Sequence, residues 1–216
     1  MDERQTDKSL PQYPLGNIYF YLTRGCNLRC RHCWISPKFQ GEGQQHPSLD
    51  LDLFRSIVAQ GKTLGLCSVK LTGGEPLIHP HILEIIGHVR DAGLGLTIET
   101  NGTVITRELA LAMLECKTPF VSVSLDGADA ETHEWMRGVE GCFDAALHGI
   151  RTLVEVGIRP QIIMSLVRRN KDRVEALVRL AESLGASSVK FNLVQPTARG
   201  EQMHRDGQTL SVEELI

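Results

Sequence analysis

The sequence predicts an α/β protein in which six parallel strands alternate with helices. Two observations support this fold class: apolar strand-like runs alternate with amphipathic helical runs, and four of the helical runs end at a glycine. Glycine ends helices because it takes the left-handed conformation at little steric cost. The glycines are Gly65, Gly93, Gly157 and Gly185, separated by 28, 64 and 28 residues, so the middle interval fits two units. Strand–helix–strand units of this length form parallel sheets with right-handed crossovers.

The strands are predicted where short apolar runs rich in β-branched residues lie between turn residues. In order, they are Asn17–Leu22, Ser68–Thr72, Leu94–Glu99, Phe120–Leu125, Arg159–Leu166 and Ser188–Val194. Six such strands suit a curved sheet or a partial barrel. A flat doubly wound sheet is the alternative that the periodicity alone leaves open.

The helices are predicted where apolar residues recur every three or four positions. In order, they are Leu51–Leu64, Pro80–Ala92, Arg107–Glu115, Phe143–Val156 and Lys171–Leu184. Asp50, Thr106 and Asn170 stand before the first, third and fifth helices, and their side chains suit the N-cap position.

Composition limits the classes of function. The chain has 216 residues, of which 42 % are apolar, which is enough for a substantial core in one domain. Its net charge of −3 gives no basic field for nucleic acid. Because it has neither a long apolar run nor the apolar segment of a signal peptide, we expect a cytoplasmic protein that does not bind membranes.

We expect three segments: a flexible N-terminal segment over residues 1–16, a core over 17–200, and the start of a linker or helix over 201–216. Ser211 and Glu214 have the spacing of a capping box, which begins helices. The sequence stops at Ile216, after about one turn, which is too short for a stable helix. We therefore expect the chain to be the N-terminal part of a longer protein.

Three cysteines follow the first strand with the spacing C-x3-C-x2-C: Cys26, Cys30 and Cys33. Three thiolates can hold three irons of a [4Fe–4S] cube and leave the fourth iron open to another ligand. Buried apolar cysteines, a zinc site and disulfides are the alternatives. The charged neighbours Arg29 and Arg31 disfavour buried apolar cysteines. Zinc sites usually pair two short ligand motifs, and the sequence has only this one. Disulfides are disfavoured because three closely spaced thiols cannot all pair. The remaining cysteines, predicted to be structural, are Cys67, Cys116 and Cys142.

Polar motifs also follow the next three strands. They are Thr72-Gly73-Gly74-Glu75-Pro76, Glu99-Thr100-Asn101-Gly102 and Ser122-Val123-Ser124-Leu125-Asp126-Gly127, the last followed by Arg137. Each alone could be an ordinary turn or strand cap. Their repetition at the carboxyl ends of parallel strands favours a shared ligand site. Either Asp126 or Glu99 could face a substrate there.

The cysteine motif and the Gly73–Pro76 motif together make the chain resemble the radical S-adenosylmethionine (SAM) enzymes from about Asn17 to Arg199. The runs CNLRCRHCW, LTGGEPL, TNGT and VSVSLDG are most similar to the branch with a C-terminal SPASM or twitch extension. That branch includes peptide maturases, anaerobic sulfatase activators, and cofactor or haem-precursor enzymes. The resemblance implies a partial (β/α)6 barrel whose three cysteines bind a [4Fe–4S] cluster. It further implies that SAM binds the open iron and is reductively cleaved to a 5′-deoxyadenosyl radical that abstracts hydrogen from the substrate.

The resemblance also implies which residues bind SAM. Gly73–Pro76 would contact the amino group of SAM, largely through the backbone. His32 stands where the family often has an aromatic residue and would touch the adenine through its backbone. The strand Phe191–Val194 would border the adenine, and Asn101 belongs to the same expected site.

The ribose and the carboxylate of SAM have their own expected partners. Ser124 would approach the ribose, with Ser165 as a further candidate, and the guanidinium of Arg137 would bind the carboxylate. The resemblance assigns no catalytic acid or base, and Asp126 is a candidate for that role.

For the substrate, we favour a ribosomal precursor peptide modified by C–H abstraction. The alternative is a small molecule in haem or cofactor synthesis, and a non-catalytic iron–sulfur electron carrier is a more distant possibility. The segment Gln195–Gly200 resembles the junction to a SPASM tail. A flavodoxin or ferredoxin would supply the reducing electron.

Overall fold

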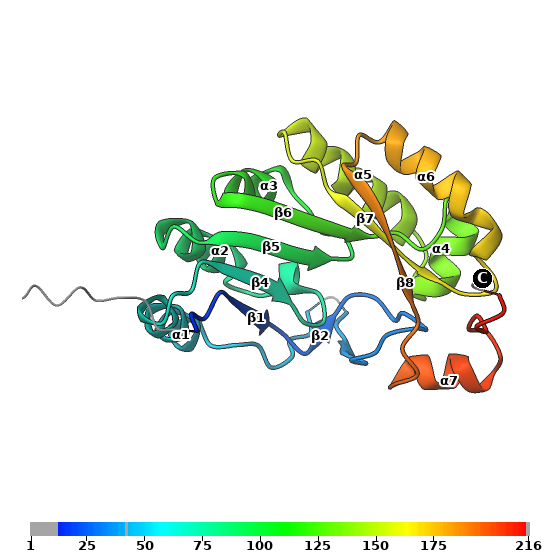
Figure 1. The fold of residues 1–216 in the computed structure, drawn as a ribbon, viewed down its shortest axis with the longest axis horizontal. Coiled ribbons are helices and arrows are strands. Elements are labelled where there is room, and N and C mark those ends of the chain that lie inside the picture. Colours follow the sequence, from blue (N-terminus) through cyan, green and yellow to red (C-terminus); the bar gives the residue numbers. More distant parts are fainter. Residues whose placement is uncertain (1–12, 42, 215–216) are drawn as a thin grey trace, which may run out of the picture.

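The computed structural model describes residues 13–41 and 43–214 as a curved parallel sheet with helices along one side (Figure 1). The strand order is β1-β4-β5-β6-β7-β8, and each neighbouring pair is parallel. Since β1 and β8 form the two edges, the sheet is an open, partial barrel, which confirms the predicted fold class. The strands are β1 (Asn17–Tyr21), β4 (Ser68–Thr72), β5 (Gly95–Thr100), β6 (Lys117–Ser124), β7 (Gln161–Leu166) and β8 (Ser188–Leu193).

The helices mostly follow the predicted periodicity. They are α1 (Leu51–Thr63), α2 (Ile82–Asp91), α3 (Arg107–Leu114), α4 (Ala130–Arg137), α5 (Cys142–Glu155), α6 (Val174–Ser183) and α7 (Arg199–Arg205), with the 3-10 turns η1 (Pro76–Ile78) and η2 (Lys171–Arg173). Every helix within the described residues falls short of the length and apolar character needed to cross a membrane.

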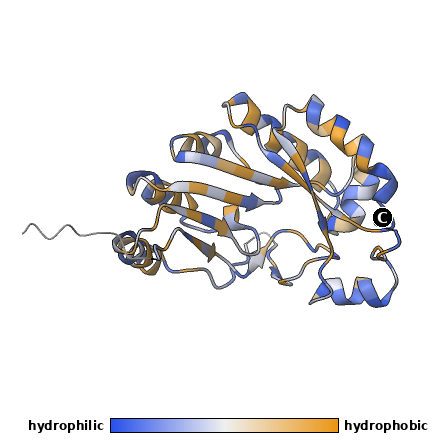
Figure 2. Ribbon diagram, viewed as in Figure 1, coloured by the Kyte–Doolittle hydropathy of each residue, from blue (hydrophilic) through white to orange (hydrophobic). Residues whose placement is uncertain are grey.

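The strands separate a buried apolar face from a partly exposed face that carries both polar and aromatic side chains. Leu71, Ile98 and Val123 are fully buried and belong to one core cluster with the helices. Lys70 and Glu99, on the opposite face, remain partly exposed. In Figure 2, the strands and most helices mix orange and blue segments, whereas α7 is mostly blue. We call the partly exposed side the inner face of the sheet.

Two of the three predicted helix caps form. The side chains of Asp50 and Thr106 accept hydrogen bonds from Leu53 N at 2.9 Å and Leu109 N at 3.2 Å. The prediction for Asn170 is wrong, because the fifth helical run begins as the turn η2 before α6 starts, and Asn170 makes no side-chain cap there. Its side chain instead accepts from Val167 N and donates to Ser165 O and to Asp126 O, the last of which lies in the loop after β6.

Sequence periodicity missed four short elements. They are the paired strands β2 (Gly25–Cys26) and β3 (Lys38–Phe39) and the helices α4 and α7. The two strands are too short to show an alternation of residues. Helix α4 has the sequence AETHEWMR, whose few apolar residues give no clear helical stripe.

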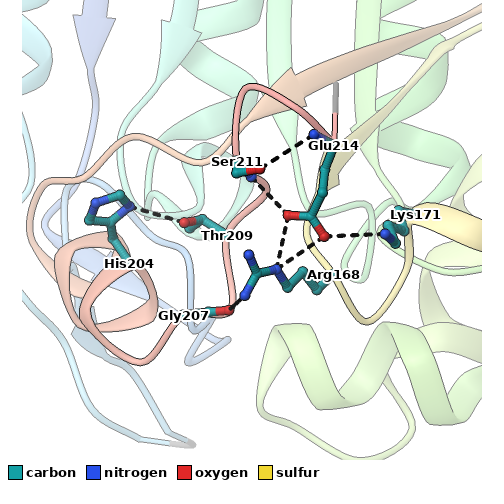
Figure 3. A network of polar contacts seen from close by, with 7 residues as sticks. All are labelled: Arg168, Lys171, His204, Gly207, Thr209, Ser211 and Glu214. Carbon is teal, nitrogen blue, oxygen red and sulfur yellow. Dashed lines mark hydrogen bonds and ion pairs between the residues drawn. The ribbon is translucent and has the colours of Figure 1, made fainter. Parts of the chain in front are cut away.

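The C-terminal segment is fastened to the loop between β7 and α6 (Figure 3). Glu214 pairs with Arg168 Nε at 3.0 Å and Lys171 Nζ at 3.2 Å, and Arg168 Nη1 donates to Gly207 O at 2.6 Å. Ser211 N donates to Glu214 Oε2 at 2.9 Å, and Glu214 N to Ser211 Oγ at 3.4 Å. The capping-box bonds therefore form in this turn. Most of the predicted N-terminal segment, and residues 215–216, lie outside the described residues.

Candidate functional site

The carboxyl ends of the strands surround a cavity of about 680 Å³. Nearly all the residues that the sequence singled out line it together, although their motifs lie far apart in the chain. Of these residues, only Pro76 and Asp126 are absent from the lining, and both are buried. The residues in the lining are Cys26, Cys30, His32, Cys33, Gly73, Gly74, Glu75, Asn101, Ser124, Arg137 and Ser165.

The cysteine loop begins in β2 and is held by its pairing with β3. Gln40 N donates to Cys26 O at 2.8 Å. Cys26 and Cys30 are buried, whereas Cys33 is half-buried. Cys142, at the start of α5, packs with Cys26 and Cys30 in one buried cluster, so it is not the isolated cysteine that its sequence position suggests.

All the cysteines in the described residues are free thiols. Burial, followed by the nearby Glu75 carboxylate, raises the pKa of Cys26 to about 12, and burial also raises the pKa of Cys30. A cation that binds these sulfurs must therefore displace their protons. Within the described residues, no three His, Cys, Asp or Glu side chains converge on a site for one metal ion. A [4Fe–4S] cube is a different case, because each of its three protein-bound irons takes only one thiolate.

The Gly73–Gly74 turn lies directly against the cysteine loop. Gly73 has a φ of 131°, which disfavours any residue with a Cβ. A Cβ on Gly74 would stand 1.8 Å from Gly25 O. Gly74 N donates to Thr23 O and Glu75 N to Gly25 O, each at 2.9 Å. These glycines are therefore required for two backbone segments to approach closely.

Glu75 joins the loops that follow β4 and β5. Its carboxylate accepts hydrogen bonds from Thr100 Oγ1 at 2.7 Å, Asn101 N at 2.8 Å and Leu77 N at 3.1 Å. Burial raises its pKa to about 6, and these bonds oppose the shift. Because the carboxylate already accepts hydrogen bonds from three protein donors, Glu75 has a structural role and holds these loops together beside the cavity.

A second connection, which sequence reasoning missed, ties the cysteine loop to the loop after β5. Asn101 Nδ2 donates to Asn27 Oδ1, and Asn27 Nδ2 donates to Thr103 Oγ1, each at 2.8 Å. Thr103 Oγ1 also donates to Asn101 Oδ1 at 2.7 Å. The sequence offered two signals of this connection. Asn27 lies between two of the motif cysteines, and Thr103 follows the Asn-Gly turn.

A buried ion pair lies beside Cys30. Arg137 Nε is 2.7 Å from Asp126 Oδ2, and Arg137 Nη1 is 3.6 Å from Cys30 Sγ. Burial alone would raise the pKa of Asp126, but the charge of Arg137, together with His32 and the hydrogen bond from Ser165 N, holds that pKa below its ordinary value. His32 Nε2 is 3.8 Å from the same carboxylate, and burial lowers its pKa to about 4.

The structure separates the two carboxylates that could face a substrate. Asp126 is fully buried and does not line the cavity, whereas Glu99 does. Glu99 Oε1 accepts from Lys70 Nζ at 2.5 Å across neighbouring strands of the inner face. The Lys70 ammonium also lies 4.9 Å from the centre of the Tyr19 ring.

The segment after β8 closes the gap between the two edge strands. Val194, Thr197 and Arg199 line the cavity. Arg199 N donates to Cys33 O at 3.2 Å, and Arg199 Nε donates to Ser36 Oγ at 3.3 Å. This return of the chain to the cysteine loop is visible in Figure 1, where α7 lies near that loop.

This geometry agrees with comparisons to known proteins. The family model of the Radical SAM superfamily matches residues 20–181. The chain belongs to the radical SAM superfamily. Enzymes of this superfamily use a [4Fe–4S] cluster and SAM. The site fits these groups, since three thiols on one loop, a cationic guanidinium and a glycine turn meet at one cavity.

Curated radical SAM relatives differ in what they make. The chain is 35 % identical over 186 residues to the AdoMet-dependent heme synthase of Methanosarcina barkeri, covering 86 % of this chain and 52 % of that protein. It is 28 % identical over 185 residues to the subtilosin biosynthesis protein AlbA of Bacillus subtilis, covering 85 % and 40 %. The chain thus spans about half the length of these two relatives or less.

Solved structures support the radical SAM fold. Streptococcus suis SuiB bound to S-adenosylmethionine has a TM-score of 0.72 and 19 % identity to this chain, covering 86 % of this chain and 42 % of that one. The structure described as native anSMEcpe with bound AdoMet has a TM-score of 0.67 and 19 % identity, covering 84 % and 52 %. At these identities, the likeness concerns the fold alone.

Proposed function

We propose that this chain is the catalytic core of an enzyme that reductively cleaves SAM at a [4Fe–4S] cluster and abstracts a hydrogen atom from its substrate. The proposal is supported by one observation above all: the motif cysteines, the Gly73–Gly74 turn and Arg137 line the same cavity. When bound, the cluster and SAM supply a 5′-deoxyadenosyl radical.

In this proposal, Cys26, Cys30 and Cys33 bind three irons. The amides of Gly74 and Glu75 already donate to the cysteine loop. An ammonium group needs acceptors rather than donors, so the carbonyl oxygens of this turn bind the amino group of SAM. Arg137 binds the carboxylate of SAM, since a fixed guanidinium suits that geometry.

Neighbouring strands carry the groups proposed for the nucleoside. Ser124 ends β6, and Ser165 lies near the end of β7, so both hydroxyls reach the cavity from the same edge of the sheet. We assign them to the ribose. His32 and Val194 lie on the two segments that flank the cavity and border the adenine, and they exclude water from it.

The first prediction concerns Cys30. Replacing it in the variant Cys30→Ala removes one of three protein ligands, so we expect loss of the cluster's broad visible absorption and of 5′-deoxyadenosine formation. Both are measured on anaerobically reconstituted protein with dithionite and SAM. Cys67→Ala is the matched control, because Cys67 is exposed and away from the cavity. Reductive SAM cleavage that persists in Cys30→Ala would refute the assignment.

We weigh two of the substrate classes that the relatives suggest. Heme synthases from three organisms are 35 %, 30 % and 32 % identical to the chain. The relative AlbA, which supports the precursor peptide favoured by the sequence motifs, is 28 % identical. We therefore propose a haem-type tetrapyrrole as the first substrate to test and a ribosomal peptide as the second.

The test uses Fe-coproporphyrin III, an iron tetrapyrrole of the proposed substrate class and the compound that a Methanosarcina barkeri relative, 31 % identical to the chain, is named for synthesising. If it is a substrate, it should raise 5′-deoxyadenosine formation and give a product of changed mass. Stimulation instead by a short peptide encoded beside the gene would favour the peptide class. We propose flavodoxin or ferredoxin as electron donor and the cytoplasm, where thiols stay reduced, as the compartment.

A further inference from the structure

Asp126 is fully buried beside Arg137 and outside the lining of the cavity, and we propose that it is a positioning residue that fixes this arginine for SAM. The inference rests on the proposed function, because it takes the SAM carboxylate as the anion that Arg137 binds. It also replaces the catalytic role that the sequence left open for Asp126.

The side chain of Arg137 is buried, so protein groups rather than water determine its orientation. It is the last residue of α4, and its side chain is only 8 % exposed. The Nε–Oδ2 contact of 2.7 Å is an ion pair without aligned hydrogen-bond geometry. A buried guanidinium without a partner is unfavourable, so Asp126 determines where the Arg137 charge lies.

Asp126 is itself fixed by three separate elements. Its Oδ1 accepts from Ser165 N in β7 at 2.8 Å, and its carbonyl oxygen accepts from Asn170 Nδ2 at 3.0 Å. Its backbone N–H donates to His133 Nδ1 of α4 at 3.1 Å. The carboxylate therefore has one position, set by tertiary contacts rather than by its own loop.

The guanidinium of Arg137 consequently lies between Asp126, Cys30 and the cavity. One side faces Asp126, Nη1 lies 3.6 Å from Cys30 Sγ, and the side chain lines the cavity. A guanidinium has five N–H donors in a rigid fork, so its orientation decides which of them face a ligand carboxylate. Removing the charge of Asp126 leaves the fork free to turn toward Cys30 alone, which would weaken SAM binding.

A merely structural ion pair would behave differently. It would change the stability of the fold, yet the affinity for SAM would be unchanged once the protein is folded and the cluster is in place. The two roles can therefore be separated by measuring SAM binding per intact cluster.

The experiment uses the variant Asp126→Asn in the reconstituted holoenzyme. Asparagine keeps an oxygen for Ser165 N and removes the charge. We expect wild-type iron content, a SAM dissociation constant raised about tenfold, and a weakened SAM-induced change in the EPR spectrum of the reduced cluster. Glu131→Gln is the matched control, because Glu131 is on the same helix but pairs with Arg169 at the surface.

A second comparison covers the case in which Asp126→Asn fails to fold. Arg137→Met and the double variant Arg137→Met/Asp126→Asn both lack the guanidinium, and the double variant leaves no unpaired buried charge while keeping an oxygen for Ser165 N. We expect the two to bind SAM equally weakly, since Asp126 acts only through Arg137. Unchanged SAM binding in Asp126→Asn, or a further loss in the double variant, would overturn the inference. A wild-type protein that neither holds a cluster nor cleaves SAM would instead contradict the proposed function.

Discussion

At the scale of single residues, the site depends on a glycine without a side chain as much as on the polar side chains around it. Gly74 lets the loop after β4 lie against Gly25, and two backbone hydrogen bonds form across that contact. Glu75 then carries the connection to the loop after β5 through its buried carboxylate. Gly74 and Glu75 thus hold the loop after β4, the loop after β5 and the cysteine loop together around the cavity.

The variant Gly74→Ala tests this close approach. Its new methyl group would stand 1.8 Å from Gly25 O, so the two loops must separate. We expect a loss of about 2–4 kcal/mol in the free energy of unfolding, from strain and lost hydrogen bonds, together with a lower iron content after reconstitution. Urea denaturation and iron analysis measure the two effects. In the control Gly87→Ala, the methyl group has space within α2, so a gain of about 0.5–1 kcal/mol is expected; equal stabilities of the two variants would refute the argument.

At the scale of elements, helix α4 connects the sheet to the cysteine loop. Asp129 caps its first turn by accepting from Thr132 N at 2.8 Å, and Gly138 ends it with a φ of 72°. The carbonyl oxygens of Met136 and Arg137 accept from Arg31 N at 2.8 Å and Arg29 N at 3.0 Å. The position of this helix therefore fixes both the Arg137 side chain and the backbone of the cysteine loop.

The variant Asp129→Ala removes the cap. We expect a loss of about 1 kcal/mol in the free energy of unfolding at neutral pH. The bond from Thr132 N holds the pKa of Asp129 below its ordinary value of 3.8, so this stabilisation is present above that pH and disappears as the carboxylate is protonated on acidification.

Urea denaturation at neutral pH and at about pH 3 checks this prediction. The difference between wild type and Asp129→Ala should shrink at the lower pH. Asp144→Ala is the control, because Asp144 is an exposed acid in the first turn of α5. A difference that grows on acidification would contradict the capping account.

At the scale of the whole molecule, the sheet leaves its two edges unpaired, and the chain itself crosses between them. After β8, it passes the cavity and returns to the cysteine loop, where Arg199 binds backbone and side-chain groups of that loop. The C-terminal turn is then fastened by Glu214 on the far side of α7 (Figure 3). Closure of the barrel therefore depends on a few polar contacts.

The variant Arg199→Ala should loosen this crossing without unfolding the sheet. We expect amide hydrogen exchange over residues 194–205 to become about tenfold faster. The variant lacks the side-chain hydrogen bonds to Ser36 and Pro37, so local opening of this segment costs less free energy. Mass spectrometry of exchanged peptides provides the measurement. Arg205→Ala is the control, since Arg205 pairs only with Glu201 within α7. Exchange as slow as in the wild type would show that Arg199 does not hold the segment.

The sequence was a good guide wherever a signal was local. Glycine-terminated helices, the caps Asp50 and Thr106, and the three-cysteine spacing are each contained in a few consecutive residues, and the sheet order follows from regular strand–helix–strand units. The cap assigned to Asn170 was wrong because its side chain bonds to Val167 N and Ser165 O just before it and to Asp126 O in a neighbouring loop. Elements as short as β2 and β3 contain too few residues to show any periodicity.

The sequence by itself determined the fold class, the family resemblance and the set of residues gathered at the carboxyl edge of the sheet. Only the tertiary structure decided what each residue there contacts. It buried Asp126 behind Arg137, left Glu99 facing the cavity, and brought Asn27 to Asn101 and Cys142 to Cys30. The physical reason is that backbone periodicity depends on neighbours in the chain, whereas burial and ion pairing depend on groups that only folding brings together.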